Sequence, residues 1–147
     1  MLIITNLDRL VAYHTWTYET GVRSRLVDFS ARAGRPITSM ASILDLEGVS
    51  SSVASSATRS YIGRASATDS AHYPETLGKM FIINVPSFFA AFWLLIKGFF
   101  DERTTRKIEI IAAPSAWRPR IKEVLGDANT PIEYGGSLKV DHIFHHR

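Results

Sequence analysis

The chain of 147 residues contains no cysteine. This absence excludes disulfide-stabilised scaffolds, thiolate metal sites and cysteine nucleophiles. Long hydrophobic runs are missing too. The longest, from Phe88 to Ile96, has nine residues, whereas a helix needs about 20 to cross a bilayer. No basic residue precedes the apolar stretch 1–5, so a signal peptide is not expected. These absences are compatible with a cytoplasmic protein.

A strong charge of one sign is also missing. The 17 Lys and Arg residues against 14 Asp and Glu give a net charge of +3, spread along the chain. Nucleic-acid-binding proteins usually carry a denser basic stripe, so no nucleic-acid partner is expected. Hydrophobic residues make up 46% of the chain, which suffices for the core of one domain.

Catalytic and nucleotide-binding signatures are absent. The chain has neither the glycine-rich dinucleotide fingerprint nor a phosphate-binding loop. The serines between Ser50 and Ser56 lack the G-x-S-x-G pattern of a nucleophile elbow. We interpret them as the polar start of a helix, although a small serine hydrolase is one alternative. His142, His145 and His146 near the C-terminus have no carboxylate pattern around them beyond Asp141, so no metal site is predicted. No acid/base constellation is found either, so no enzyme activity is predicted.

The hydrophobic pattern predicts alternating helices and strands. Helices are expected at 7–33, 50–71, 86–99 and 116–125. Strands are expected at 40–46, 79–85 and 107–113, with a short fourth strand at 132–134. The polar segment 101–106 is predicted to be a loop or short turn. This alternation is typical of an α/β layer fold with a mostly parallel sheet.

The predicted helix at 86–99 is unusual because it has no polar face before Lys97. Such a helix is buried on every side or faces lipid. The pattern alone slightly favours a central core helix. The alternative is a helix with one side lining a lipid pocket and the other side touching a membrane.

Five ordered segments resemble the CRAL-TRIO lipid-binding domain, in its phosphatidylinositol/phosphatidylcholine transfer branch. The most specific is YPETLGKMFIINVP at 73–86. The others are WTYE at 16–19, ILDLEGVS at 43–50, KI at 107–108 and PIEYGG at 131–136. The resemblance covers residues 5–138, and 139–147 is expected to be a flexible tail. The N-terminal helical lobe of that family has no counterpart here.

The resemblance implies a hydrophobic lipid pocket, floored by the sheet and closed by a mobile gate helix. By position, Glu75 and Lys107 match the residues that contact the inositol-phosphate headgroup, and Ser42 and Tyr18 match pocket residues. The gate helix corresponds to the segment carrying Phe88, Phe89, Phe92, Trp93 and Ile96. Met40 replaces one hydroxyl residue of the choline-lipid site, so phosphatidylinositol is the expected ligand ahead of phosphatidylcholine.

The expected function is therefore binding of one phospholipid and its transfer between membranes, without covalent chemistry and without a cofactor. The protein would be cytoplasmic and peripheral on Golgi or other internal membranes. A lipid-sensing module that recruits the protein to membranes without moving lipid is one alternative. A non-functional fragment is another.

Overall fold

The computed structural model describes residues 6–140. Its chain begins with α1 (Leu7–Thr20), a π-helical segment (Gly21–Arg25) and α2 (Leu26–Ala33). These three follow one another without a break, as the sequence predicts for 7–33. The Asn6 side chain caps α1 by accepting a hydrogen bond of 2.9 Å from the Arg9 backbone N–H. Gly34 ends α2 at φ 63°, a left-handed conformation that glycine adopts readily.

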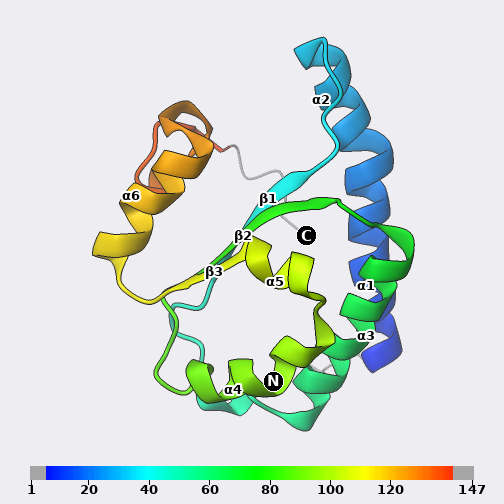
Figure 1. Cartoon of the computed structure of the whole chain (residues 1–147), viewed down its shortest axis with the longest axis vertical. Coiled ribbons are helices and arrows are strands. Elements are labelled where there is room, and N and C mark those ends of the chain that lie inside the picture. The colour runs from blue at the N-terminus through cyan, green and yellow to red at the C-terminus, as the bar shows by residue number, and fades with distance from the viewer. Residues whose placement is uncertain (1–5, 141–147) are drawn as a thin grey trace.

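Three parallel strands form the sheet in the order β1 (Met40–Asp45), β2 (Leu77–Ile83) and β3 (Ile108–Ile111). Phe81 of β2 lies beside Ile43 of β1 and Glu109 of β3. The predicted α/β class with a parallel sheet is thus confirmed. Figure 1 shows helices on both sides of the sheet.

The central strand β2 is apolar on both faces because a helix covers each of them. On one face, Phe81 and Ile83 pack with Trp117 and Ile121 of α6 (Pro114–Leu125). On the other face, Ile82 packs with three side chains of α4 (Phe89–Ile96). The near-continuous hydrophobicity of this strand in the sequence therefore reflects two separate core clusters.

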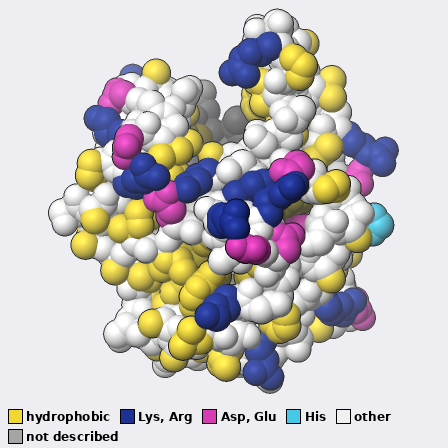
Figure 2. All heavy atoms as spheres, in the orientation of Figure 1, with side chains coloured by type: hydrophobic (Ala, Val, Ile, Leu, Met, Phe, Trp, Pro, Cys, Tyr) yellow, Lys and Arg dark blue, Asp and Glu magenta, His cyan; other side chains and the backbone are white. Residues whose placement is uncertain are grey.

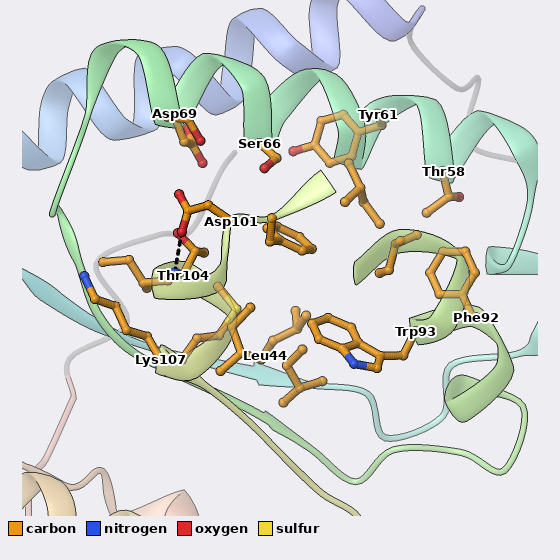
Figure 3. Close-up of a pocket in the computed structure, with 18 of the residues that line it drawn as sticks. Leu44, Thr58, Tyr61, Ser66, Asp69, Phe92, Trp93, Asp101, Thr104 and Lys107 are labelled. Carbon is orange, nitrogen blue, oxygen red and sulfur yellow. Dashed lines mark hydrogen bonds between the residues drawn. The ribbon is translucent and has the colours of Figure 1, made fainter. Parts of the chain in front are cut away.

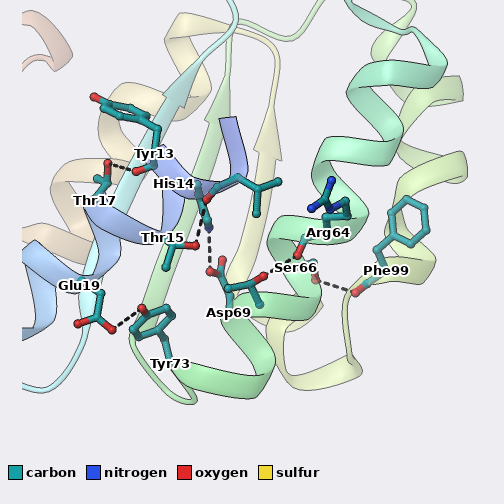
Figure 4. A network of polar contacts seen from close by, with 12 residues as sticks. Tyr13, His14, Thr15, Thr17, Glu19, Arg64, Ser66, Asp69, Tyr73 and Phe99 are labelled. Carbon is teal, nitrogen blue, oxygen red and sulfur yellow. Dashed lines mark hydrogen bonds and ion pairs between the residues drawn. The ribbon is translucent and has the colours of Figure 1, made fainter. Parts of the chain in front are cut away.

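The long helix α3 (Ser56–His72) packs against α1. His14 Nε2 lies 2.8 Å from Asp69 Oδ1, and Arg64 Nη1 donates to Asp8 Oδ1 at 2.7 Å. Figure 4 shows the first of these contacts within a wider polar network. Among the serines between 50 and 56, Ser55 has a structural role, because its side chain accepts the Thr58 backbone N–H as the N-cap of α3.

Two predicted elements are wrong. The segment expected to be a loop at 101–106 instead forms α5 (Glu102–Lys107). Asp101 starts this helix by accepting the Thr104 backbone N–H at 2.6 Å, a local capping signal that the charged composition obscured. The fourth strand expected at 132–134 is a 3₁₀ turn, Ile132–Tyr134.

The glycine pair after this turn explains why no strand forms there. Gly135 has φ 89°, and a Cβ atom on Gly136 would lie 2.0 Å from the Thr130 carbonyl oxygen. The chain therefore folds back onto Thr130, and only an isolated bridge between Pro131 and Leu138 results.

Among residues 6–140, no helix is long and apolar enough to cross a membrane. Within the same range, no group of His, Asp and Glu side chains has a metal-binding arrangement. His142, His145 and His146, and residues 141–147 of the predicted tail, lie outside the described residues.

Candidate functional site

A cavity of about 880 Å³ lies between the sheet, α3 and α4. The sheet contributes its apolar floor, with Leu44 from β1, Met80 and Ile82 from β2, and Ile108 from β3. Figure 3 shows side chains from opposite walls pointing into this space. A volume of this size lies in the upper part of the roughly 300–1,000 Å³ range of small-molecule pockets.

Helix α4 forms an apolar wall of the cavity beside α3. The five residues predicted for the gate helix all line the cavity: Phe88, Phe89, Phe92, Trp93 and Ile96. The Trp93 ring stacks on Phe89 and Phe100, with ring centroids 6.3 Å and 5.9 Å apart. Every residue that the sequence assigned to the gate helix therefore lies beside the cavity. Their gating role stays a prediction.

The outer face of α4 is exposed. Leu94 and Leu95 have 64% and 58% of their surface accessible. The central core helix that the pattern slightly favoured is therefore wrong. The helix has apolar residues all round because one side lines the cavity and the other faces outward. The lipid and membrane contacts of the alternative interpretation stay predictions.

The C-terminal end of this helical segment is tied to α3. Ser66 Oγ donates a hydrogen bond of 2.7 Å to the Phe99 carbonyl oxygen, and Ser66 is buried. The Phe99 ring also lies over Gly63, where a Cβ atom would be 3.4 Å from it. Small residues on α3 therefore allow the wall and the gate segment to approach closely.

Two cations meet one carboxylate at one end of the cavity. Lys107 Nζ donates to Glu75 Oε2 at 3.1 Å, and Arg103 Nη1 donates to Glu75 Oε1. These bonds, first from Arg103 and then from Lys107, lower the pKa of the Glu75 carboxyl below its usual value. The sequence prediction paired Glu75 with Lys107, and the structure brings them together. Their headgroup role stays a prediction.

The backbone of Glu75 is held in a left-handed conformation at φ 64°. A non-glycine residue in this region carries strain, which is found most often at functional positions. Arg103 was missed because the segment containing it was predicted as a loop. Once α5 is a helix, Arg103 and Lys107 are four residues apart and share one face.

Tyr18 and Ser42 have different surroundings. Tyr18 of α1 lines the cavity, and burial, together with the nearby charge of Asp69, raises its pKa to about 12. Ser42 is not among the lining residues, although it pairs with Met80 and shares its strand face with Leu44. The lipid-binding roles of both residues stay predictions.

A polar wall was not predicted from the sequence. Thr58, Tyr61, Ser66 and Asp69 lie along one side of α3 and line the cavity (Figure 3). Their spacing of three, five and three residues, which keeps them on one side of a helix, was available as a signal, but the Ser- and Ala-rich composition of this segment concealed it. The cavity therefore has an apolar side and a polar side.

On one face of the molecular surface, charged and hydrophobic side chains also gather in different regions. Figure 2 shows Lys and Arg side chains gathered with Asp and Glu side chains near the middle of one face, where α5 lies. Hydrophobic side chains are exposed between this charged region and α4. The cationic end of the cavity thus adjoins an apolar surface.

Comparisons with known proteins agree with this architecture. Residues 5–136 match the family model of the CRAL/TRIO domain. The chain is 33% identical to a phosphatidylinositol/phosphatidylcholine transfer protein, SFH12 of Arabidopsis thaliana, over 93% of this chain and 25% of that protein. It is 35% identical to the SEC14 cytosolic factor of Kluyveromyces lactis, over 95% of this chain and 46% of that protein.

The crystal structure of Sfh5 superposes with a TM-score of 0.65 at 28% identity, covering 78% of this chain and 38% of that one. The chain spans a quarter to less than half of the curated relatives named above. The family model nevertheless covers most of its length. The chain therefore belongs to the CRAL/TRIO domain family.

Proposed function

We propose that this chain binds one phospholipid in the cavity and transfers it between membranes, with no covalent chemistry and no cofactor. The observation that carries the proposal is an apolar cavity of about 880 Å³ with Lys107 and Arg103 at one end. Apolar walls suit acyl chains, and the cations suit a phosphate group. The name of the Arabidopsis thaliana relative SFH12 describes transfer of this class of lipid.

The proposed headgroup is phosphatidylinositol. Lys107 and Arg103 would pair with its phosphate, and Glu75 would accept hydrogen bonds from inositol hydroxyl groups. Phosphatidylcholine is the weaker candidate, because Met40 stands where a hydroxyl residue is expected and Ser42 does not line the cavity.

The outer face of α4 is proposed to contact the membrane surface during loading and release. Leu94 and Leu95 expose more than half of their surface there, and apolar side chains of this kind insert into the interface of a bilayer. The proposed location is the cytoplasmic side of Golgi or other internal membranes, in keeping with the "cytosolic factor" names of several relatives.

Native mass spectrometry with lipid extraction, on the chain purified from a eukaryotic host, tests the proposal. We expect one phosphatidylinositol per chain. Lys107→Ala is expected to lower loading about tenfold, because a charge-assisted contact to phosphate is lost. Arg106→Ala is the matched control, since Arg106 lies on the same helix and pairs with Glu102 but does not itself line the cavity.

Unchanged phosphatidylinositol loading in folded Lys107→Ala protein would contradict the proposed headgroup site. Vesicle-to-vesicle transfer then separates a carrier from a membrane-recruitment module. A carrier moves labelled lipid from donor to acceptor vesicles, whereas a recruitment module binds the vesicles and moves none.

A further inference from the structure

Glu19, the last residue of the WTYE segment, has no part in the proposed headgroup site. It lies on α1, and it does not line the cavity. Its Oε1 accepts a hydrogen bond of 2.7 Å from Tyr73 Oη, across 54 positions of the chain (Figure 4). This bond lowers the pKa of the Glu19 carboxyl, so the acceptor is ionised at neutral pH. Hydrogen bonds to an ionised acceptor are stronger than those between neutral groups.

Tyr73 begins the tight turn that presents Glu75. The Thr76 backbone N–H donates to the Tyr73 carbonyl oxygen at 3.3 Å, which closes a β-turn. Pro74 and Glu75 occupy its two central positions. Proline fixes a negative φ at the first of them, and Glu75 has φ 64° at the second. This combination is that of a type II turn, whose second central position favours glycine, so Glu75 is strained and its surroundings must hold it there.

The turn is anchored at both ends. At its end, Thr76 is buried, and its carbonyl oxygen accepts the Met40 backbone N–H at 2.8 Å, which ties it to the start of β1. At its beginning, the Tyr73 ring lies 5.4 Å from the Tyr18 ring of α1, measured between centroids, and the Tyr73 hydroxyl group is held by Glu19. Helix α1 and strand β1 thus hold the turn from its two ends.

The conformation of the turn decides what the Glu75 carboxylate reaches. Its oxygens accept from Lys107 at 3.1 Å and from Arg103. The Glu75 side chain is 56% exposed, and water screens ion pairs at such positions, so the two cations alone hold it weakly. The backbone must therefore direct this side chain toward the cavity. A relaxation of Glu75 to negative φ changes the direction in which the side chain leaves the backbone.

We propose that Glu19 is a positioning residue for the phosphatidylinositol headgroup site: through Tyr73, it holds the strained turn that directs Glu75 toward inositol hydroxyl groups. This inference rests on the proposed phospholipid-binding function. It gives the final glutamate of the WTYE segment a role separate from that of Tyr18, which lines the cavity directly. Because Glu19 does not line the cavity, an effect of its replacement on lipid loading must reach the lipid through other residues.

A double-mutant cycle on phosphatidylinositol loading tests the proposal. The full chain is incubated with vesicles that contain graded amounts of phosphatidylinositol, and bound lipid is counted by native mass spectrometry. Glu19→Ala is expected to lower loading about fivefold, and Glu75→Ala about tenfold. In the Glu75→Ala background, Glu19→Ala should have no further effect, because the carboxylate that the turn positions is already gone. A merely structural role would lower loading equally in both backgrounds.

Two variants serve as controls. Glu19→Gln should keep most of the wild-type loading, because the amide oxygen of glutamine still accepts from Tyr73. Glu19 also pairs with Arg23, four residues further along the helical segment. Asp28→Asn is the matched control, because it too removes a carboxylate from such a pair, with Arg32, and does not line the cavity. Its loading should equal that of the wild type. If Glu19→Ala fails to fold, Tyr73→Phe, which removes only the hydroxyl group, replaces it in the cycle with the same expected outcome.

Wild-type loading in folded Glu19→Ala protein would overturn the positioning role, and so would an equal fold-loss in the two backgrounds. Either result leaves the proposed function standing when Glu75→Ala alone lowers loading. Unchanged loading in Glu75→Ala overturns the headgroup site together with the positioning role. Absence of any bound phospholipid in the wild type overturns the proposed function as well.

Discussion

Replacing Asn84 should destabilise the junction between the sheet and the gate helix. Asn84 follows β2 directly and has a left-handed backbone at φ 52°. Its side-chain amide donates to Asp45 Oδ1 at 2.9 Å, and its side-chain oxygen accepts from Trp117 Nε1 at 2.9 Å. One side chain thus joins the ends of β1 and β2 to α6, immediately before the segment that leads into α4.

The cost of Asn84→Ala has three parts. Trp117 is only 3% exposed, so its indole N–H loses its hydrogen-bond partner away from water, at about 1–3 kcal/mol. The lost contact with the partly exposed Asp45 adds about 0.5–1 kcal/mol. Alanine in a left-handed conformation adds about 1 kcal/mol. We expect a total of about 2.5–5 kcal/mol.

Urea denaturation followed by far-UV circular dichroism measures this free energy of unfolding. Asn84→Gly separates backbone from side chain, since glycine accepts the positive φ. It should be about 1 kcal/mol milder than Asn84→Ala. A double-mutant cycle with Trp117→Phe isolates the indole hydrogen bond, and Asn84→Ala should cost about 1–3 kcal/mol less in that background.

A cost below about 1 kcal/mol for Asn84→Ala would refute the bridging role, because the unpaired indole alone should exceed it. An unchanged cost in the Trp117→Phe background would show that the hydrogen bond contributes nothing measurable. Equal stability of the alanine and glycine variants would remove the backbone part of the argument.

Two further predictions concern acid stability and membrane contact. Arg120 and then Lys79 lower the pKa of Glu109 to about 2 from an ordinary 4.5, so its stabilisation is complete above pH 4.5 and is lost as pH falls towards 2. The free energy of unfolding should fall less between pH 5 and pH 2 in Glu109→Gln than in the wild type. The difference should be up to about 2 kcal/mol, because water screens part of the interaction. An unchanged pH profile, or an equal effect of the control Glu133→Gln, would contradict this. Leu94→Glu should slow vesicle-to-vesicle lipid transfer severalfold at unchanged thermal stability, because Leu94 is 64% exposed on α4; unchanged transfer would argue against membrane contact by that face.

Local sequence patterns predicted most of the fold. The near-continuous apolar run of β2 indicated a strand covered on both faces, and the structure places α6 and α4 on those faces. The two wrong predictions, at 101–106 and 132–134, arose because a short-range contact outweighed the composition of the segment. The cap at Asp101 turned a charged segment into α5, and the close approach of Gly136 to Thr130 replaced a strand by a turn.

The sequence motif also identified part of the site. Glu75 and Lys107 were paired by resemblance, and they lie in contact 32 positions apart. Arg103 escaped notice because its position beside Glu75 depends on α5 being helical. Nothing local indicated that His14 and Asp69, which are 55 positions apart, would meet at the cavity wall.

By itself, the sequence determined the alternation of helices and strands, the family resemblance and the apolar character of the segment around Phe92. These follow from periodicity, composition and short motifs, which act over a few residues. Only the tertiary structure decided that Leu94 faces outward while Phe92 is buried, and that α3 gives the cavity a polar wall. The reason is physical: which side of an all-apolar helix is buried depends on the packing of distant elements against it.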